Sequence, residues 1–336
     1  MLTKQEIVDL LTDKDETVVK NLFDRADRIR REFVGDAIHL RGLIEFSNYC
    51  RRDCLYCGLR KSNKEVVRYR MTIEEIFAAA VKAGNLDFRT IVLQSGEDRY
   101  YAVEDLCRLV QRIKSSLGIA VTLSIGERAY EDYKKLKDAG ADRYLLRFET
   151  SDPLLFGKLK PDSVYEKRFR CIQWLTELGY QVGSGSMIGL PGQSVESLAD
   201  DILKFKELEL DMVGIGPYIA HPGTPLCGSA DGTIDMVLRV TALTRIITKN
   251  THMPATTATG TIDPGGRQKA LRCGCNVLMP NLTPSTYRKH YFIYPGKICI
   301  GEDPTTCRFC VGNMIAGLGR TASAGPGHSL KGHFRQ

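Results

Sequence analysis

The chain has 336 residues, of which 43% are hydrophobic and 26% charged, and its formal net charge is +7 at pH 7. This length allows one large domain or two, and the composition is that of an ordinary globular protein. The first residues form a charged amphipathic segment rather than a signal peptide, and no apolar run is long enough to span a membrane. We therefore expect a cytoplasmic protein with no membrane partner.

The positive charges are scattered over helical stretches such as 134–137, where a solvated helix face is the simplest interpretation. No basic stripe with interleaved aromatic residues occurs, so nucleic acid is a poor match as a partner. An anionic small molecule fits the sign of the charge better.

Residues 3–36 predict two helices, and after them a strand, a turn and a helix recur along the chain. Capping-box spacing in two pairs, Thr72 with Glu75 and Ser163 with Glu166, predicts the start of two helices. The expected strands are 39–47, 90–95, 120–126, 143–149, 182–189, 212–219, 254–261 and 276–281. The helices between them are expected at 72–84, 103–117, 129–139, 164–178, 194–209, 234–248 and 266–273.

Eight strands alternating with helices favour an α/β fold, a complete (βα)8 barrel of the TIM type with N-terminal helices and a C-terminal extension. A doubly wound open sheet is the alternative, but no G-x-G-x-x-G follows the first strand. We expect residues 1–36 to form the N-terminal helical segment, 37–290 the barrel, 291–320 a C-terminal segment and 321–336 a flexible basic tail.

Polar residues occur at the C-terminal ends of the expected strands, where the active site of such a barrel lies. In chain order they are Gln94, Ser95, Glu97, Thr122, Ser124, Arg147, Glu149, Ser184, Ser186, Tyr218, His221, Thr256, Thr257 and Asn281. Their gathering at one end predicts a site, although any single hydroxyl could instead be a satisfied core group or a helix cap.

Three of the 11 cysteines form a run after the first strand, Cys50-x3-Cys54-x2-Cys57. Three thiolates can hold three irons of a 4Fe–4S cluster and leave the fourth iron open, whereas clusters made for electron transfer normally have four cysteines. A structural zinc site would need a fourth ligand from elsewhere, and a disulfide would need an oxidising compartment. The run therefore predicts an iron–sulfur cluster whose open iron binds a reactant.

An open iron could bind the amino and carboxylate groups of S-adenosylmethionine, and a reduced cluster could then release a 5′-deoxyadenosyl radical. The ammonium group needs an acceptor such as Ser95 or Glu97, and the carboxylate needs an arginine such as Arg147 or Arg168. Candidate walls for the adenine are Tyr56 and the stretches 188–191 and 214–217.

The cysteine run, with Tyr56 before its last cysteine, resembles the signature of the radical S-adenosylmethionine superfamily, and 94–98 resembles its second-strand element. Further stretches are similar to the HydE family, maturases of FeFe hydrogenases. They are 144–150, 185–193, 211–217, 254–257 and 294–299. The cysteine run specifies the superfamily alone, and the combination points to the family.

The resemblance implies a radical enzyme of hydrogenase maturation with a 4Fe–4S cluster and S-adenosylmethionine at the top of a (βα)8 barrel. Its substrate would be an iron–cysteine complex carrying carbon monoxide and cyanide, made by HydG. The radical would attack the sulfur of that complex, the scaffold HydF would receive the product, and an electron donor would be required.

The resemblance also implies roles for particular residues. The implied cofactor contacts are Ser95, Glu149, Arg168, Met212 and Tyr291. The implied interior anion site consists of Thr122, Arg147, Thr256 and Thr257. An arginine among hydroxyls in a dry barrel suits a ligand that carries cyanide or carboxylate.

A second cysteine set, Cys299-x7-Cys307-x2-Cys310, follows the last expected strand. Its spacing matches a surface cluster, usually 2Fe–2S, that is found in part of this family. No fourth ligand is evident, and a zinc site or a set of free thiols is the alternative.

Other functions remain open at this stage. One is another radical enzyme of the same barrel class, making methylornithine or biotin. No expected strand carries a cysteine for the interior cluster of a biotin synthase, and the C-terminal cysteine set favours HydE over methylornithine synthase. The other is a non-catalytic carrier of an iron complex, which would have no need for cofactor contacts around an open iron.

Overall fold

The computed structural model describes residues 2–331. The chain begins with α1 (Lys4–Thr12) and α2 (Glu16–Val34) and continues as alternating strands and helices. The strands are β1 (His39–Leu40), β2 (Gly42–Ser47), β3 (Thr90–Ser95), β4 (Ala120–Ser124), β5 (Arg143–Leu145), β6 (Gln181–Ile188), β7 (Met212–Pro217) and β8 (Val277–Leu278). The helices after α2 are α3 (Ile73–Asn85), α4 (Val103–Leu117), α5 (Tyr130–Asp138), α6 (Pro153–Leu159), α7 (Tyr165–Glu177), α8 (Val195–Glu207), α9 (Ile234–Thr248), α10 (Thr257–Ile262), α11 (Gly266–Arg272), α12 (Ser285–Arg288) and α13 (Pro304–Gly317).

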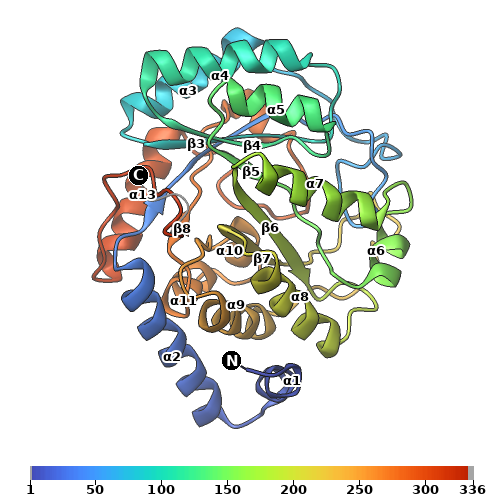
Figure 1. The fold of residues 1–336 in the computed structure, drawn as a ribbon, viewed down its shortest axis with the longest axis vertical. Coiled ribbons are helices and arrows are strands. Elements are labelled where there is room, and N and C mark those ends of the chain that lie inside the picture. The colour runs from blue at the N-terminus through green and yellow to red at the C-terminus, as the bar shows by residue number, and fades with distance from the viewer. Residues whose placement is uncertain (1, 332–336) are drawn as a thin grey trace.

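Six parallel strands form one sheet in the order β2-β3-β4-β5-β6-β7, which is also their order along the chain. The helices that connect them lie on the outer side of the sheet (Figure 1). Because both faces of such a sheet are covered, its strands carry nearly continuous buried runs, as in β3, where Thr90 to Leu93 are all buried. The fold is therefore α/β with a parallel sheet, as expected.

The strands β1 and β8 form a separate parallel pair, and isolated backbone bridges lie between this pair and the two edges of the larger sheet. On one side Met212 pairs with His252, and Pro254 pairs with Val277. On the other side Leu43 of β2 pairs with Asn281. The contacts between the two sheets are thus single bridges rather than continuous strands.

The helices pack through apolar stripes of helical period. In α4 the buried residues Leu106, Leu109, Val110 and Ile113 lie on the face toward the sheet. The expected capping box of α3 is confirmed, because Thr72 and Glu75 each bond the backbone of the other. The other expected capping box is wrong: α7 follows Val164, and no side chain caps it.

The two N-terminal helices lie against α8 and α9 on the outside of the sheet (Figure 1). The ion pair between Lys4 and Asp200, at 2.7 Å, links α1 to α8. With α2 across its outer face, α9 is buried nearly all round, from Val237 to Thr248. This segment therefore completes the packing of two sheet-covering helices.

One expected strand, 254–261, is wrong. Its first residues make only bridge contacts, and α10 begins at Thr257. Thr256 is the cap of this helix, because its hydroxyl accepts a hydrogen bond from the Thr259 backbone at 3.3 Å. The expected strand 143–149 ends earlier, at Leu145, and the helices α6 and α13 were not expected.

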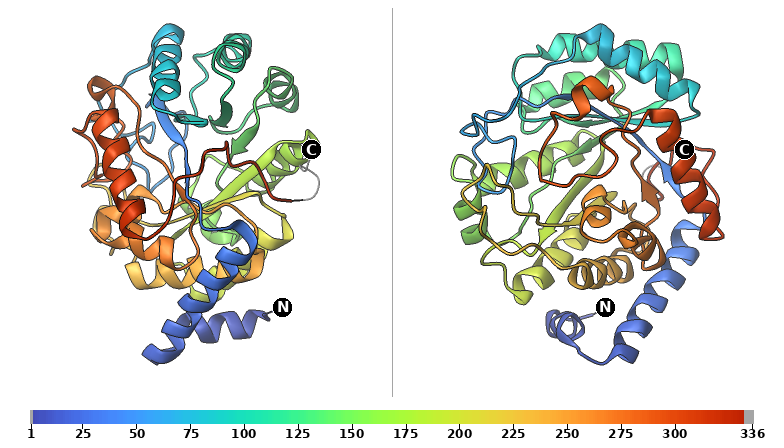
Figure 2. Two further views of the ribbon diagram at one scale, coloured as in Figure 1. Left: turned by 90° about the vertical axis from the view of Figure 1, so that its left-hand side faces the viewer. Right: turned by 180° about the vertical axis from the view of Figure 1, so that it is seen from behind.

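The segment 321–331 differs from the expected flexible tail, since it lies against the N-terminal ends of the strands. The Pro326 carbonyl accepts hydrogen bonds from Thr90 of β3 at 2.7 Å and from Arg143 of β5 at 2.9 Å. Figure 2 shows the segment, in dark red, crossing the molecule from α13. Residues 332–336 lie outside the described part of the chain.

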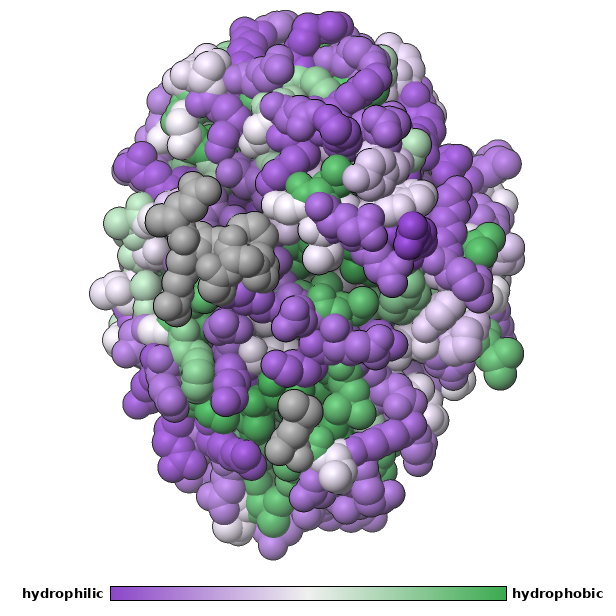
Figure 3. Space-filling view, viewed as in Figure 1, coloured by the Kyte–Doolittle hydropathy of each residue, from purple (hydrophilic) through white to green (hydrophobic). Residues whose placement is uncertain are grey.

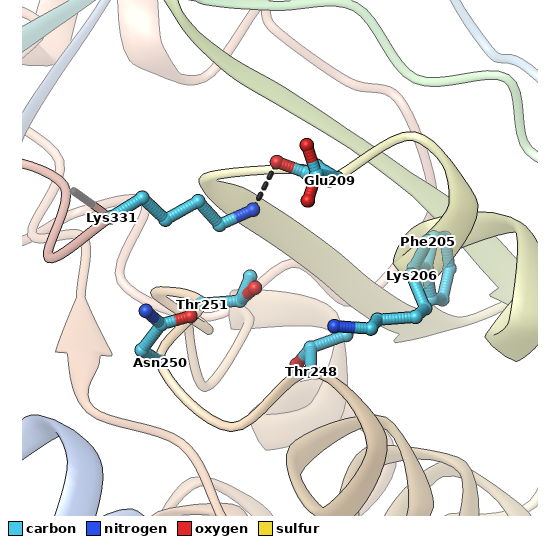
Figure 4. Close-up of a pocket in the computed structure, with 7 residues that line it drawn as sticks. All are labelled: Phe205, Lys206, Glu209, Thr248, Asn250, Thr251 and Lys331. Atoms are coloured by element: carbon cyan, nitrogen blue, oxygen red, sulfur yellow. Dashed lines mark hydrogen bonds between the residues drawn. The ribbon is translucent and has the colours of Figure 1, made fainter. Parts of the chain in front are cut away.

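Lys331 is the last residue of this segment. Its ammonium donates to the carbonyls of Glu209, shown as a dashed line in Figure 4, and of Leu210 at 2.8 Å. Thr251 lines the same pocket. These bonds join the end of the described chain to the turn between α8 and β7.

The face of the molecule in Figure 3 is mostly hydrophilic, and its hydrophobic residues are exposed in separate areas. Among residues 2–331, no helix combines the length and apolar character needed to cross a membrane.

Candidate functional site

The cysteine run forms a loop that follows the C-terminal end of β2. Asn48, fully buried, begins the loop and donates its amide to the carbonyls of Val67 and His290, both at 2.8 Å. The turn after β3 lies directly against it. A Cβ on Gly96 would come within 2.2 Å of the Tyr49 carbonyl, so this close approach requires glycine.

The three thiols of the loop are removed from solvent to different degrees: Cys54 is buried, and Cys50 and Cys57 are half-buried. Burial raises the pKa of all three, that of Cys50 to about 11. The Glu97 backbone N–H donates to the Cys50 sulfur at 3.3 Å. Because burial penalises the thiolate form, bound metal is the natural source of the compensating charge, and the three residues fit a cluster.

A network of buried ion pairs surrounds the loop. Glu127, only 1% exposed, accepts from Arg52 at 2.6 Å and from Arg168 at 2.8 Å. Arg52 also donates to the carboxylate of Glu97. Two arginines are therefore held in place by carboxylates rather than by solvent.

Glu97 is held in place by donors of the protein. Its Oε1 accepts from the Glu127 backbone at 2.8 Å, and its Oε2 is paired with Arg52. A carboxylate offers about four lone-pair sites, so these bonds orient Glu97 and leave it able to accept from an ammonium group. Ser95, the other expected acceptor, donates its hydroxyl to the Gly96 carbonyl at 2.6 Å.

Two residues of this region were missed by sequence reasoning. Glu127 follows the end of β4, so the strand-end rule that selected its neighbours could have found it. Lys160, 3% exposed, follows α6, and burial together with the nearby charge of Arg168 lowers its pKa to about 8. It lies on an irregular stretch after a helix that was not expected.

Glu149 and Arg147 lie together beyond the end of β5. The Arg147 Nη2 is 3.0 Å from Glu149 Oε2 and donates to the Ser186 carbonyl at 2.7 Å. Glu149 has a φ of +73°, a conformation that costs a side-chain-bearing residue about 1–3 kcal/mol. Arg168 is tied to the same segment, because its Nη1 donates to the Arg147 carbonyl at 2.8 Å.

Two residues of the predicted anion site carry a buried polar atom that lacks a hydrogen-bond partner among the described residues. They are Thr122, through its Oγ1, and Arg147, through its Nε. An unsatisfied buried group costs about 1–3 kcal/mol, so each of these donors is suited to a polar ligand.

The other two predicted anion residues begin α10. The Thr256 hydroxyl is engaged with Thr259, and a Cβ on Gly216 of β7 would come within 2.9 Å of it. Thr257 is partly exposed. Thr256 therefore lies against β7.

Tyr56 and Tyr291 lie at the site. Tyr56 packs against a small apolar cluster that includes Leu190 and Tyr218, which offers a wall of the kind adenine requires. Tyr291, 3% exposed, accepts from the Gln94 side chain at 3.2 Å.

Met212 is not brought to the cysteine loop. It is the first residue of β7, whereas the cysteines follow the C-terminal end of the parallel strand β2. Its sulfur is 2.7 Å from Arg41 Nη1, near the segment 321–331. The expectation that Met212 lies with the other cofactor contacts is therefore wrong.

The second cysteine set is only partly assembled. The ligand atoms of Cys299, Glu302 and Cys307 all lie within 4.8 Å of one another. Cys310 lies on α13 and is exposed. Two of the three predicted cysteines are thus close together beside a carboxylate, and Cys310 follows Cys307 three residues later on the same helix.

Comparison with known proteins agrees with this geometry. Residues 44–205 match the family model of the radical SAM superfamily. The FeFe hydrogenase maturase subunit HydE of Thermotoga maritima is 52% identical over 333 residues, 99% of this chain and 94% of that protein. A 3-methylornithine synthase of Methanosarcina acetivorans is 29% identical over 279 residues, 82% of this chain and 79% of that protein.

Two solved structures are similar in fold. The crystal structure of methylornithine synthase (PylB) has a TM-score of 0.85 at 25% identity and covers 96% of this chain and 94% of its own. The maturase HydG of Carboxydothermus hydrogenoformans has a TM-score of 0.73 at 21% identity, covering 83% and 67%. Radical SAM proteins use a 4Fe–4S cluster and S-adenosylmethionine, and the three-thiol loop fits both. The chain belongs to the HydE family of FeFe hydrogenase maturases and is a radical S-adenosylmethionine enzyme.

Proposed function

We propose that this enzyme cleaves S-adenosylmethionine reductively and directs the 5′-deoxyadenosyl radical to an iron–cysteine complex carrying carbon monoxide and cyanide. The reaction would serve assembly of the di-iron subcluster of FeFe hydrogenase. The observation that carries the proposal is the unpartnered, buried Nε of Arg147 beside Arg168, which the buried carboxylate of Glu127 ties to Arg52 of the three-thiol loop. A carrier would not require that combination.

Cys50, Cys54 and Cys57 would hold the cluster, which supplies the electron that breaks the carbon–sulfur bond of the sulfonium. Arg168 is suited to the carboxylate of the cofactor. Its Nε and Nη1 are fixed by Glu127 and the Arg147 carbonyl, and no described residue accepts from its Nη2. The arginine is therefore oriented before any ligand arrives.

The remaining contacts would orient the nucleoside. Tyr56 and its apolar cluster would cover the adenine, while Glu149 and Tyr291 would contact the cofactor from two other sides. Ser95 and Glu97 are the candidate acceptors for the ammonium group, and Arg52 and the Glu127 backbone hold the Glu97 carboxylate in place.

The substrate would lie among the interior polar atoms. Thr122 and Arg147 offer donors without protein acceptors, and Thr256 and Thr257 would complete the anion site from the side of β7. We also infer that the strands close into a complete (βα)8 barrel. The isolated bridges that join β7 to the stretch 252–255, that stretch to β8, and Asn281 to β2 support this closure, which would exclude water from the radical.

The proposal includes partners. HydG would supply the iron complex, HydF would receive the product, and a low-potential protein would donate the electron. The identity of 52% to a HydE supports a place in that sequence, and the lower identity of 29% to methylornithine synthases makes their reaction the second candidate.

The test is anaerobic reconstitution with iron and sulfide, followed by reduction and EPR with and without S-adenosylmethionine. We expect a 4Fe–4S signal that shifts when the cofactor is added, formation of 5′-deoxyadenosine, and consumption of the HydG product. The matched control for any cysteine substitution in the three-thiol loop is Cys107→Ala, which removes a half-buried cysteine on α4, outside that loop. A spectrum that does not change with S-adenosylmethionine would refute the radical mechanism, and formation of 3-methylornithine without consumption of the HydG product would favour the methylornithine reaction.

A further inference from the structure

The excess positive charge of the chain is largest in the segment that follows β2. Residues 51–70 contain seven arginines and lysines and two carboxylates, a net charge of +5, whereas the whole chain carries +7. The segment includes the three-thiol loop and lies at the edge of the molecule, on the side opposite α13 (Figure 1). This charge is therefore placed beside the first cysteine site.

Part of the charge has no carboxylate partner. Arg52, Arg60 and Arg70 are paired with carboxylates of neighbouring residues. In contrast, Lys61 and Lys64 are exposed and form no ion pair with another residue of the described chain. Their charges are thus available to another molecule.

A pocket with largely apolar walls opens between this segment and the stretch after α12. Its volume is about 550 Å³, and its lining includes Val66, Val67, Pro222 and Phe292. Lys289 belongs to the same lining and is exposed, so lysines lie on both sides of the apolar surface. An apolar centre with a polar rim is the usual construction of a protein–protein interface.

The pocket lies directly against the cysteine loop. His221, 4% exposed, lines it and packs on Gly58, because a Cβ on Gly58 would come within 2.5 Å of the His221 Nε2. Asn63, another residue of the lining, donates to the Gly58 carbonyl at 2.8 Å. Since Gly58 follows Cys57, one residue and one hydrogen bond connect the pocket to a thiol of the loop. An electron that arrives at the pocket has a short path to a cluster held there.

A single arginine fixes the pocket wall to the loop. Arg68 follows Val67 and donates to the carbonyls of Asn48, before the cysteines, and Leu59, after them, at 2.5 and 3.0 Å. The Val67 carbonyl in turn accepts from the Asn48 amide at 2.8 Å. A protein docked on this wall would therefore be held at a defined distance from the thiols.

The sign of the charge selects the partner. S-adenosylmethionine carries two positive charges and one negative charge, so a basic surface would not attract it. An acidic protein is attracted by such a surface, which raises its rate of encounter at low ionic strength. The proposed reaction requires an electron from another molecule, and this surface adjoins the loop that would receive it.

We propose that the basic surface formed by Lys61, Lys64 and Lys289 around the apolar pocket is the docking site of an acidic protein that donates one electron to the cluster. The electron passes from the reduced donor, which is oxidised, to the cluster of the three-thiol loop, which is reduced. No bond forms or breaks in this step, and no proton is transferred. The inference rests on the proposed function, because it requires a redox-active cluster at this loop.

The test compares two ways of reducing the reconstituted holoenzyme. The protein donor is an acidic two-cluster ferredoxin, kept reduced by NADPH and a ferredoxin reductase, and the small-molecule donor is excess dithionite. Formation of 5′-deoxyadenosine is measured against ferredoxin concentration at low and at physiological ionic strength.

The triple variant Lys61→Glu, Lys64→Glu, Lys289→Glu should raise the half-saturating ferredoxin concentration by at least about 10-fold at low ionic strength. The difference should shrink with added salt, because the Debye length falls from about 30 Å at 0.01 M to about 8 Å at 0.15 M. The rate with dithionite should equal that of the parent, which also shows that the variant is folded and holds its cluster.

The matched control reverses three exposed charges on and just before α2, in the variant Lys14→Glu, Lys20→Glu, Arg25→Glu. It changes the net charge by the same amount and should respond to ferredoxin nearly as the parent does. Val67→Ser should raise the half-saturating concentration about 3–10-fold at both ionic strengths, because it removes an apolar contact rather than a charge.

Equal losses in the two triple variants would show that net charge alone governs the encounter and would overturn the docking site. A half-saturating concentration that is unchanged in the surface variant would overturn it as well. If the parent forms no 5′-deoxyadenosine with dithionite, the radical mechanism itself is refuted and the docking proposal with it. The dithionite reaction thus distinguishes a failure of the surface from a failure of the proposed function.

Discussion

The two cysteine sites of this molecule differ in the spacing of their ligands and in what surrounds them. Among the described residues, Cys299, Glu302 and Cys307 form a group within single-ion reach, and the sulfurs of Cys50, Cys54 and Cys57 form no such group. A 4Fe–4S cluster places its thiolates on separate irons and therefore needs them farther apart. Two cysteine motifs of similar spacing are thus arranged differently in the structure.

The charged neighbours differ in the same way. Near the first site, Arg52 and Arg168 are paired with the carboxylate of Glu127, which orients one arginine toward a ligand. Near the second site, Arg288 instead bonds the backbone carbonyls of Cys299 and Glu302. Buried carboxylates therefore orient arginines at the first site, whereas a buried arginine orients the backbone at the second.

Replacing one cysteine in each site should separate their roles most strongly. Cys54→Ala should reduce 5′-deoxyadenosine formation to background, because three thiolates are needed to leave a single iron open. Cys307→Ala should leave that activity at the wild-type level, because the second set lies outside the reaction. Product analysis by liquid chromatography measures both, and equal losses in the two variants would contradict the separation.

The same substitution of glutamate in each site should give unequal losses of stability. Glu127→Gln removes the charge between two buried arginines and should lower the free energy of unfolding by about 3–5 kcal/mol. Glu302→Gln in the metal-free protein should cost less than about 1 kcal/mol, since no cation is left unpaired. Urea denaturation of the two variants tests this contrast, which fails if Glu302→Gln is the more destabilising change.

A buried ion pair connects the two regions. Lys297, two residues before Cys299, lies 2.6 Å from Glu45 of β2, the strand that leads to the first site. Lys297→Met should lower the free energy of unfolding by about 2–3 kcal/mol, because Glu45 then keeps only its hydrogen bond from Asn281.

A double variant, Lys297→Met with Glu45→Gln, serves as the control for that pair. It should recover much of the loss, because no buried charge is then left without a partner. If the double variant is as unstable as the single one, packing of the lysine chain rather than its charge explains the effect.

Sequence periodicity predicted most of the elements because each helix buries one face and each strand both. The expected bounds of β3, α4 and α9 agree with the structure. The predicted strand 254–261 is wrong because its threonines have high β propensity, whereas in the structure Thr256 caps a helix. The prediction of a flexible tail rested on glycine, serine and proline, which are typical of disorder. In the structure, carbonyls of this segment instead accept hydrogen bonds from Arg143 at the start of β5.

The candidate site was predictable where chemistry follows spacing along the chain. The cysteine run, Arg168 and Glu149 were found in this way. The pairing of Glu127 with two arginines depends on α7 and the first loop meeting in space, which no local pattern encodes.

The smallest expected effect is on how the free energy of unfolding depends on pH. Asp201 lies behind the first site and accepts from the Ser151 backbone at 2.5 Å and its hydroxyl at 2.7 Å. Burial raises the pKa of its carboxyl from 3.8 to about 7. The folded state therefore binds a proton more tightly than the unfolded chain, so stability is highest at low pH and falls as pH rises toward 7.

The expected size of this effect is about 1.4 kcal/mol between about pH 6 and pH 8. Asp201→Asn should remove that part of the pH dependence, because the amide does not titrate. Urea denaturation of both proteins at the two pH values isolates the contribution, since all other titrating groups are shared. If the variant loses stability with pH as steeply as the wild type, Asp201 is ionised in the folded protein throughout this range. The ionised Asp201 carboxylate would then be stabilised more strongly than its hydrogen bonds from Ser151 indicate.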